Sequence, residues 1–592
     1  MIPVSTRSYN NSRTGANVSE TILTHAALKT RGIKVFQTLQ FEGDARGSEG
    51  AMLIQPNVHC ADGLFHDVGF VATMANNVYG YDANTGTMLW MRRLGNPIKG
   101  LKSMDMFLIN DHWGILSTPV IDSTTAIGWV VSWNSVDGTM ANAQYMLHGI
   151  RLDSGADATS PISLDTATYQ PPGSLPLQHF NGVARKQRCG LLMTTINGVK
   201  TIFIGAGSFL ESASTNQGWV VAVDVTNSAK PFVSAAWCSS IKFGGSGIWQ
   251  GGQGLTADTD GYVYGMTGNG SFDGVTDFGE SFFKLRYTPP NGTTSGKLSI
   301  VDWWSPFSDT GRVGGDPTLV DESLITNPRM AEPIFPHVQI VDEAATTNMN
   351  GYDDQDLGSG GPLIIPSLGF MIGAGKDGIA YVLHMSNMGK TVNADFASNK
   401  IQANYAKLAS PPLWFTYYNP DVSPRPIDLT DLDTLYQGKT HHQHSTPVYY
   451  ESSVHGHIVF TWGENANLRA WNLSNGGLLS YLAGGAEMAS PDTPPPGGMP
   501  GGMISLSTNE TKRGSAILWA CVPYGDANKK ITQGRLIAYD AENFVNGQIQ
   551  KLWDSADWNI QFSHNKFNIP HVWNGIVYCP TYDDRVLMFS LA

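Results

Sequence analysis

Histidines cluster at one point of the chain, in the stretch HHQH at 441–444. If a strand begins here, His442 and His444 project to the same side of it, because side chains alternate along extended backbone. Two imidazoles placed in this way suit a transition metal, with Glu464 or Asp356 as a third ligand. The structural alternative is a hydrogen-bonded loop in which one histidine lines a channel.

Other side chains suit acid/base chemistry. Glu464 and Asp356 have the residue types of a pair that cleaves a glycan, or they are structural carboxylates in turns. His444 is a candidate general base because imidazole titrates near neutral pH. Lys376 completes the catalytic candidates. Together with Arg188 it suits a carboxylate or sulfate ligand, or it balances the charge of the acids.

The elements that must position these residues are short strands joined by tight turns. Residues 245–269, GSGIWQGGQGLTADTDGYVYGMTGN, show the pattern: a glycine-rich lead-in, a short apolar run, an Asp/Gly turn and an alternating strand. This order recurs about eight times. The 65 glycines, 32 prolines and 15% charged residues are typical of turn-rich β structure.

The first complete unit has four predicted strands, at 52–56, 68–74, 78–82 and 87–92. Four antiparallel strands joined by short turns are the blade of a propeller. Glycine- or proline-containing lead-ins mark the innermost strand of each blade, at Gln55-Pro56, 114–119, 187–190, 249–251, 358–362, 444–447, 500–503 and 566–568. The sequence therefore predicts an all-β fold: a single eight-bladed β-propeller of four-stranded antiparallel blades.

The predicted organisation is an N-terminal arm at 1–32 followed by the propeller at 33–592. The last unit lacks an outer strand, and Val35–Phe41 lacks a partner. We therefore expect this early strand to complete the last blade and so remove two sheet edges. We also expect Arg13 and its neighbours to dock the arm on the propeller. Insertions interrupt the rhythm at about 306–355, 385–440 and 491–498.

Propeller topology predicts where the polar residues meet. In a blade with strands A to D from the inside outwards, the lead-in to A and the B–C turn lie on the same face. Residues from these segments should converge on one mouth of the axial channel, which makes it the default binding site. The set is Arg188, Trp249, Gln250, Asp356, Lys376, Asp377, His442, His444, Glu464, Asn465, Lys566 and Asp583. Of these, Arg188, Trp249, Gln250, Asp377, Asn465, Lys566 and Asp583 are assigned to ligand binding.

Several stretches resemble one family. YDANTGTMLW at 81–90, with a looser copy at 537–541, is similar to the repeat of pyrroloquinoline-quinone (PQQ) propellers, the quinoprotein alcohol dehydrogenase-like superfamily. The resemblance is closer to a secreted branch of PQQ-like repeat proteins. It is carried by YNNSRTGAN at 9–17, GIWQGG at 247–252, DLGSGGP at 356–362, GKDG at 375–378, WGEN at 462–465 and GMPGGM at 498–503.

This resemblance implies a propeller, with PQQ as a candidate cofactor. The vicinal Cys-Cys pair that typically packs on the quinone is absent here, and the expected calcium-ligand and catalytic-Asp pattern is not found. Calcium and a transition metal stay open as alternatives. DTDG at 258–261 looks like a fragment of a calcium loop, but a β-turn is favoured because an A–B hairpin is needed there.

Composition limits the partners and the location. A net charge of −13 argues against nucleic acid, and no apolar run reaches the length of a membrane helix. The chain has no signal-peptide pattern at its start, which leaves either a cytosolic protein or the mature form of a secreted one. N-x-S/T sequons favour a secreted glycoprotein; they occur at Asn10, Asn17, Asn269, Asn291, Asn472 and Asn509. The five scattered cysteines allow at most one or two disulfides.

Three functions are therefore open. The first is a binding module for an extracellular carbohydrate or other polymer. The second is an oxidoreductase that acts on alcohols or sugars through PQQ or a metal. The third is a polysaccharide lyase or hydrolase that uses Glu464, Asp356 and His444.

Overall fold

The fold is described from a computed structural model of the chain. It describes residues 1–41, 47–100, 109–208, 217–242, 244–270, 272, 274–292, 294–305, 312–313, 316–320, 356–376, 379–388, 390–392, 414–417, 442–493 and 498–592. The insertions expected at 306–355 and 385–440 fall largely outside these residues, as do residues 494–497 of the third.

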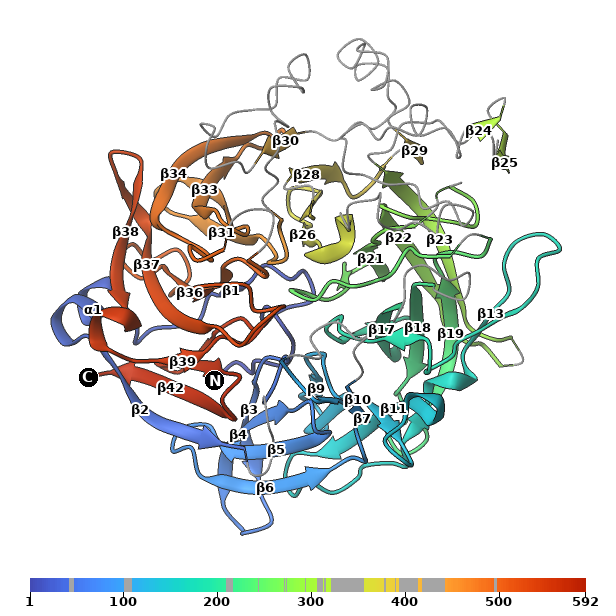
Figure 1. The fold of residues 1–592 in the computed structure, drawn as a ribbon, viewed down its shortest axis with the longest axis horizontal. Helices are drawn as coiled ribbons and strands as arrows, with labels where there is room; N and C mark the ends of the chain where they lie inside the picture. The colour runs from blue at the N-terminus through green and yellow to red at the C-terminus, as the bar shows by residue number, and fades with distance from the viewer. Residues whose placement is uncertain are drawn as a thin grey trace.

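Short antiparallel strands stand in a ring around a central axis (Figure 1). Most of the described strands belong to four-stranded meanders that run outwards from the axis, and a parallel pairing between the outer strands of two meanders joins them into one larger sheet. The first four are β3–β6 (Leu53–His59, Phe65–Ala72, Asn77–Asp82, Met88–Arg93), β9–β12 (Val120–Asp122, Ile127–Ser135, Ala143–Arg151, Ile162–Ser163), β16–β19 (Leu192–Ile196, Val199–Ser208, Trp219–Asp224, Phe232–Cys238) and β20–β23 (Thr256–Ala257, Tyr262–Met266, Phe282–Thr288, Lys297–Ser305). The all-β propeller prediction is confirmed.

The remaining meanders follow in chain order. They are β26, β27, β28 and β30 (Leu363–Ile365, Phe370–Ala374, Ile379–His384, Trp414–Tyr417), β31–β34 (Val448–Ser452, Gly456–Thr461, Asn467–Leu473, Leu479–Met488), β35–β38 (Met503–Ser507, Ile517–Pro523, Gln533–Val545, Gln548–Asp554) and β40–β42 (His571–Trp573, Ile576–Pro580, Arg585–Leu591) with β2 (Ile33–Gln40). Shorter elements complete the described chain: β1 (Ala16–Asn17), α1 (His25–Arg31), β7 (Ile98–Lys99), β8 (His112–Trp113), β13 (Thr168–Tyr169), β14 (Gln178–His179), β15 (Arg185–Lys186), β24 (Arg312–Val313), β25 (Asp316–Val320), β29 (Thr391–Val392), β39 (Phe562–Ser563) and 3-10 turns that include η4 (Leu357–Ser359) and η6 (Ser555–Trp558). No helix among the described residues is long and apolar enough to cross a membrane.

The ring is closed by strands from the two ends of the chain. β2 pairs antiparallel with β42, so that Ile33 lies opposite Leu591 and Gln40 opposite Arg585. The early strand therefore completes the last sheet, as the sequence predicts. This pairing removes two sheet edges that would otherwise be open to other chains.

The apolar core lies between neighbouring sheets. Trp129 of β10 and Val221 of β18 belong to one buried cluster, and Phe203 of β17 and Phe283 of β22 belong to the next. Each sheet is covered on both faces, which is why its strands are apolar in nearly continuous runs. The clusters hold the sheets at fixed angles, so the turns at their inner ends keep a fixed relation to one another.

One sequence expectation is wrong. Gln55 and Pro56 do not lead into the first innermost strand but lie inside β3. The register with β4 shifts between Gln55 and Val58, and Asn57 has φ 58°. Proline lacks an N–H for the ladder, so the strand bulges at this point. The lead-in to this strand is residues 47–52, with the sequence GSEGAM.

The N-terminal arm runs along the inner edges of the innermost strands. Backbone hydrogen bonds join Val4 to Ile54, Ser5 to Ile121, Asn11 to Ala257, Ser12 to Ile364, Thr14 to Tyr449 and Gly15 to Leu506, at 2.7–3.0 Å. These contacts reach the innermost strands of six meanders: β3, β9, β20, β26, β31 and β35. The edges of the innermost strands are thus covered by the chain's own backbone.

Two buried arginines anchor the arm on the axis. Arg13 donates from Nε to the carbonyl of Leu255 at 2.9 Å and from Nη2 to that of Leu191 at 2.9 Å. Arg7 donates from Nε to the carbonyl of Gly252 at 3.0 Å, and its Nη2 to that of Phe567. The expectation that Arg13 docks the arm is confirmed. Burial lowers the pKa of both guanidinium groups, to about 10 for Arg13 and about 9 for Arg7.

Candidate functional site

The histidine stretch and one turn of the same sheet form the centre of the candidate site. His442 and His444 lie in the lead-in to β31, and Glu464 lies in the turn between β32 and β33. The backbone N–H of Glu464 donates to the carbonyl of His442 at 2.8 Å, which ties the turn to the lead-in. Lead-in and B–C turn therefore meet on one face, as propeller topology predicts.

The three side chains converge. His444 Nε2 lies 3.0 Å from Glu464 Oε1, and His442 Nδ1 lies 3.8 Å from Glu464 Oε2. One ligand atom from each residue can be chosen so that all lie within 4.8 Å of one another. A tetrahedral ion with metal–ligand distances of about 2.0–2.2 Å sets its ligand atoms about 3.4 Å apart. The two measured separations lie on either side of this value.

The chemistry of the donors also fits a metal. Two imidazoles and a carboxylate are the ligand set of zinc sites that keep an open coordination position. His444 and Glu464 are buried, and His442 is partly exposed. Burial raises the pKa of the Glu464 carboxyl to about 7, although His442, Lys376 and Lys566 nearby favour its charged form.

Asp356 belongs to a different arrangement. Its Oδ2 accepts a 2.8 Å hydrogen bond from Lys376 Nζ, and its Oδ1 accepts the backbone N–H of Asn269 at 2.9 Å. The Lys376 backbone also donates to the Asp356 carbonyl at 3.0 Å. Both charges are buried and paired. Glu464 rather than Asp356 is therefore the carboxylate in the histidine cluster.

Arg188 is likewise paired with a carboxylate, one that the sequence analysis missed. Its Nε donates to Glu49 Oε2 at 2.9 Å, and the Tyr582 hydroxyl donates to Glu49 Oε1 at 2.8 Å. The guanidinium lies over the rings of Trp113 and Phe567, at 5.9 and 5.1 Å from their centroids. Glu49 lies in the lead-in to β3. The sequence analysis missed Glu49 because it placed this lead-in at Gln55-Pro56.

Gln250 and Trp249 lie in the lead-in to β20. Gln250 is fully buried, and its Oε1 accepts the backbone N–H of Met266 at 2.9 Å. Trp249 packs its indole against the backbone at Gly207 and Gly247, where a Cβ would lie 2.7–2.8 Å from the ring. Among the described residues, Trp249 Nε1 and Gln250 Nε2 are buried donors without an acceptor.

The remaining candidates are held by local contacts. Asn465 has φ 50° and donates to the Ser490 carbonyl at 3.2 Å, which braces the turn that carries Glu464. Lys566 Nζ donates to Asn528 Oδ1 and lies 4.8 Å from the centroid of Phe567. Asp583 pairs with Arg585 at 2.7 Å in the β41–β42 turn. Asp377 lies outside the described residues.

The DTDG stretch is a turn. Asp258 Oδ1 accepts the backbone N–H groups of Asp260 and Tyr262 at 3.0 and 2.9 Å, and the Tyr264 hydroxyl donates to Oδ2 at 2.7 Å. This network closes the hairpin between β20 and β21. The Asp258 carboxylate therefore stabilises the turn through its hydrogen bonds.

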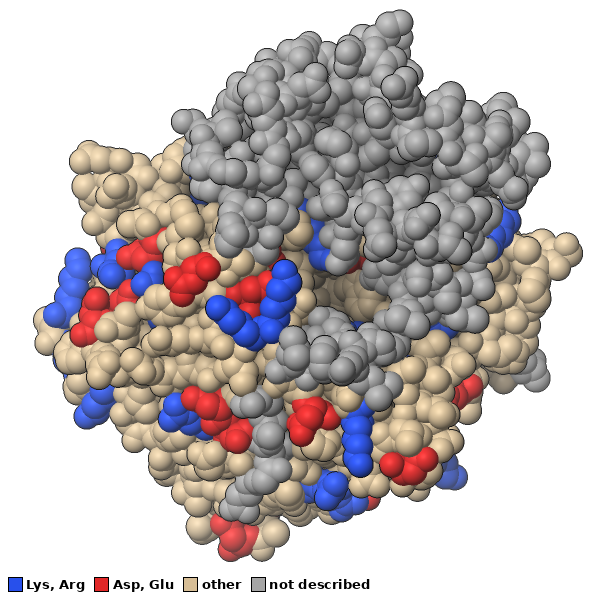
Figure 2. Space-filling view, viewed as in Figure 1, with Lys and Arg blue, Asp and Glu red and all other residues tan. Residues whose placement is uncertain are grey.

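The surface is hollowed near the middle of the ring, with acidic and basic side chains beside the hollow (Figure 2). Two cations of the site are paired with carboxylates, Arg188 with Glu49 and Lys376 with Asp356, and Lys566 donates to the amide oxygen of Asn528. The closest cysteine sulfurs, those of Cys521 and Cys579, are 3.9 Å apart on β36 and β41 and are not neighbours in sequence. The vicinal cysteine pair that is typical of PQQ propellers is therefore missing.

Comparison with known proteins gives distant structural likenesses. No family model matches the chain, and no curated protein matches it in sequence. Among solved structures, quinohemoprotein alcohol dehydrogenase from Comamonas testosteroni aligns at 12% identity and TM-score 0.47, covering 100% of this chain and 80% of that one. BamB from Moraxella catarrhalis aligns at 10% identity and TM-score 0.42, covering 94% and 99%. A europium-containing methanol dehydrogenase aligns at 11% and 0.44, covering 100% and 85%.

The sequence resemblance to PQQ-repeat propellers points to the same group of structures. At these identities and TM-scores the likeness says nothing about activity. The propeller fold of this chain rests on its own strand pairing.

Proposed function

We propose that the axial mouth binds a divalent transition-metal ion through His442, His444 and Glu464, and that the ion helps to hold an extracellular carbohydrate. The observation that carries the metal is the convergence of three buried or half-buried ligand atoms within 4.8 Å. The three ligands leave at least one coordination position, which a hydroxyl or carboxylate oxygen can fill.

The surroundings of the cluster favour a hydroxyl-rich ligand. Arg188 and Lys376 are each balanced by a carboxylate, so no strong preference for an anion arises from them. Trp249 Nε1 and Gln250 Nε2 are donors that an oxygen atom of a ligand or an ordered water would satisfy. A leftover buried donor costs roughly 1–3 kcal/mol, so filling such a position contributes to binding.

The metal is tested by titration. Purified protein is stripped with chelator, then titrated with Zn²⁺, Mn²⁺ and Cu²⁺ in a calorimeter. We expect one ion per chain, with at least 100-fold weaker binding in His444→Ala and Glu464→Gln. His112→Ala is the matched control, since His112 is an exposed histidine paired with Asp111. If the native chain and the three variants bind the ions equally tightly, the proposed metal site is wrong.

The carbohydrate is tested separately on a glycan array, with the metal-loaded protein and with the chelated one. We expect binding that is lost on chelation and in Glu464→Gln. Binding that survives chelation would place the ligand elsewhere while leaving the metal result intact. If the metal-loaded protein binds no glycan, the proposal of carbohydrate binding is wrong, whereas the proposal of metal binding still stands.

A lyase or hydrolase is the second candidate. The observation in its favour is the Glu464 carboxyl, whose pKa is raised by burial to about 7, only 3.0 Å from His444 Nε2. A carboxyl with this pKa can donate or accept a proton near neutral pH. Incubation with polysaccharides should then release short products from the native protein and none from Glu464→Gln.

A further inference from the structure

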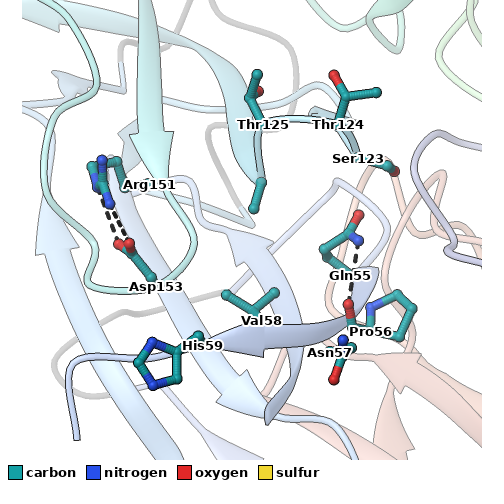
Figure 3. Close-up of a pocket in the computed structure, with 11 residues that line it drawn as sticks. Gln55, Pro56, Asn57, Val58, His59, Ser123, Thr124, Thr125, Arg151 and Asp153 are labelled. Atoms are coloured by element: carbon teal, nitrogen blue, oxygen red, sulfur yellow. Dashed lines mark hydrogen bonds and ion pairs between the residues drawn. The ribbon is translucent and has the colours of Figure 1, made fainter. Parts of the chain in front are cut away.

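A second polar cavity lies between the first two sheets, with a volume of about 260 Å³ (Figure 3). Its walls are the end of β3 (55–59), the turn between β9 and β10 (123–126) and the end of β11 at Arg151 with Asp153 beyond it. The A–B and C–D turns lie at the opposite end of each sheet from the lead-ins and B–C turns. This cavity is therefore on the face away from the histidine cluster.

The bulge in β3 shapes the cavity. Pro56 and Asn57 are the residues that fall out of register with β4, and Asn57 adopts φ 58°. The Asn57 backbone N–H bonds to Asp67 Oδ1 at 2.9 Å instead of to a strand, which holds the bulge open. Bulges re-aim side chains and recur beside binding sites. Here the bulge brings Asn57 to the cavity wall.

The lining offers neutral hydrogen-bonding groups. Asn57 and Ser123, both exposed, contribute an amide and a hydroxyl to the lining. Arg151 Nε and Asp153 Oδ1 form an ion pair at 3.2 Å on one side of the cavity, facing Gln55 and Asn57 across it (Figure 3). Arg151 lowers the pKa of Asp153, so both stay charged and cancel. The cavity presents donors and acceptors without a net charge.

An exposed aromatic ring packs at the rim of the cavity, on His59, which is one of the lining residues; the ring belongs to Phe65, which does not itself line the cavity. Phe65, in β4, is 65% exposed and lies opposite His59 of β3, with ring centroids 4.9 Å apart. The neighbouring Leu64 is 60% exposed. An aromatic side chain left in water beside a polar cavity is the arrangement that binds a sugar, whose ring has one apolar face and hydroxyls at its edge.

We propose that this cavity binds one neutral sugar unit of a polysaccharide, with its hydroxyls against Asn57 and Ser123 and its apolar face at the rim where Phe65 packs on His59. The volume lies just below the roughly 300–1,000 Å³ of drug-sized ligand pockets, which suits a single ring. The site does not depend on the proposed axial function. If both sites are occupied, the two faces of the propeller bind polymer at once and avidity rises.

The test uses the full chain and neutral hexose and pentose oligosaccharides, with uronic acid oligosaccharides for comparison. Binding is measured by calorimetry and by saturation-transfer NMR. We expect neutral oligosaccharides to bind, with at least ten-fold weaker binding in Phe65→Ala and several-fold in Asn57→Gly, a change that keeps the positive φ. Phe232→Ala is the matched control, because Phe232 is an exposed phenylalanine on another sheet.

Two results would overturn the proposal: no binding of any neutral oligosaccharide at millimolar concentration, or equal binding by Phe65→Ala, Asn57→Gly and the native chain. Glu464→Gln and chelation separate this site from the axial one. Binding here should persist under both treatments. A loss of neutral-sugar binding on chelation would assign it to the axial mouth and count against the second site.

Discussion

Paired charges decide how the axial mouth is built at the scale of single residues. Lys376 and Asp356 are both buried and 2.8 Å apart, and each keeps the other charged in a place where a lone ion is costly. The pair holds the β27–β28 turn against the lead-in to β26. It therefore fixes the shape of the site near Glu464 without supplying a metal ligand.

Removing one member of this pair should be costly. Lys376→Met leaves Asp356 buried without its cation, and we expect the free energy of unfolding to fall by about 3–5 kcal/mol. Lys376→Met/Asp356→Asn should recover part of the loss, because no lone charge remains. Urea denaturation of both variants measures the difference. Equal stability of the single and double variants would contradict this account.

Two buried histidines predict how stability depends on pH. Burial lowers the pKa of His571 and of His148 to about 4. The unfolded value is about 6.5, so between these values the unfolded chain binds more protons than the folded one. The free energy of unfolding should therefore fall as the pH drops from about 6.5 towards 4, by up to about 3 kcal/mol per histidine.

This pH dependence is checked by urea denaturation at several pH values. His571→Gln, whose amide can still donate to the Met52 carbonyl that His571 Nδ1 contacts at 2.8 Å, should flatten the curve. His112→Ala, at an exposed site, should leave it unchanged. A curve with the same slope in His571→Gln would show that the pKa of His571 is not lowered in the folded protein.

The sequence indicated some site residues and concealed others. His442 and His444 were visible because alternation along a strand places them on one side, and topology then brought Glu464 to them. Glu49 was hidden because a bulge at Pro56 moved the apparent lead-in by several residues. Arg7 gave no local signal, since its partners Gly252 and Phe567 are 245 and 560 positions away.

The arm is the element whose removal should matter most. It covers the inner edges of the innermost strands, and Arg7 and Arg13 make long-range hydrogen bonds on the axis. We expect deletion of residues 1–17 to lower Tm by more than 10 °C and to promote aggregation, because it exposes strand edges.

The matched control for the arm is Arg31→Ala. Arg31 is an exposed arginine at the end of α1, and we expect little change in Tm. The Tm of Arg13→Ala should lie between those of the arm deletion and of Arg31→Ala. An arm deletion that melts like the native chain would mean that the inner edges are stable without cover.

The sequence predicted where the strands lie better than it predicted the residues at which they begin and end. Lead-ins such as 114–119 and 444–447 do precede β9 and β31. Glycine and proline mark such turns because only a few residues suit the backbone there. The course of the arm was not predictable beyond Arg13, because its contacts are with backbone atoms of distant strands rather than with a recognisable pattern.

Closure of the ring governs the molecule as a whole. Lys34 of β2 lies opposite Ser590 of β42, and neither is buried. A disulfide in Lys34→Cys/Ser590→Cys should lock the two ends together and raise the free energy of unfolding by about 2–4 kcal/mol. The same variant under reducing conditions is its own control. No difference between oxidised and reduced protein would mean that opening at β2–β42 does not limit stability.

The central claim is a metal ion at the axial mouth, and crystals of the chain grown with Zn²⁺ test it most directly. Data collected on both sides of the zinc absorption edge should show one anomalous peak about 2.0–2.2 Å from nitrogen atoms of His442 and His444 and an oxygen of Glu464. The peak should vanish in Glu464→Gln. An empty site in the native chain, or a peak that persists in Glu464→Gln, would contradict the account.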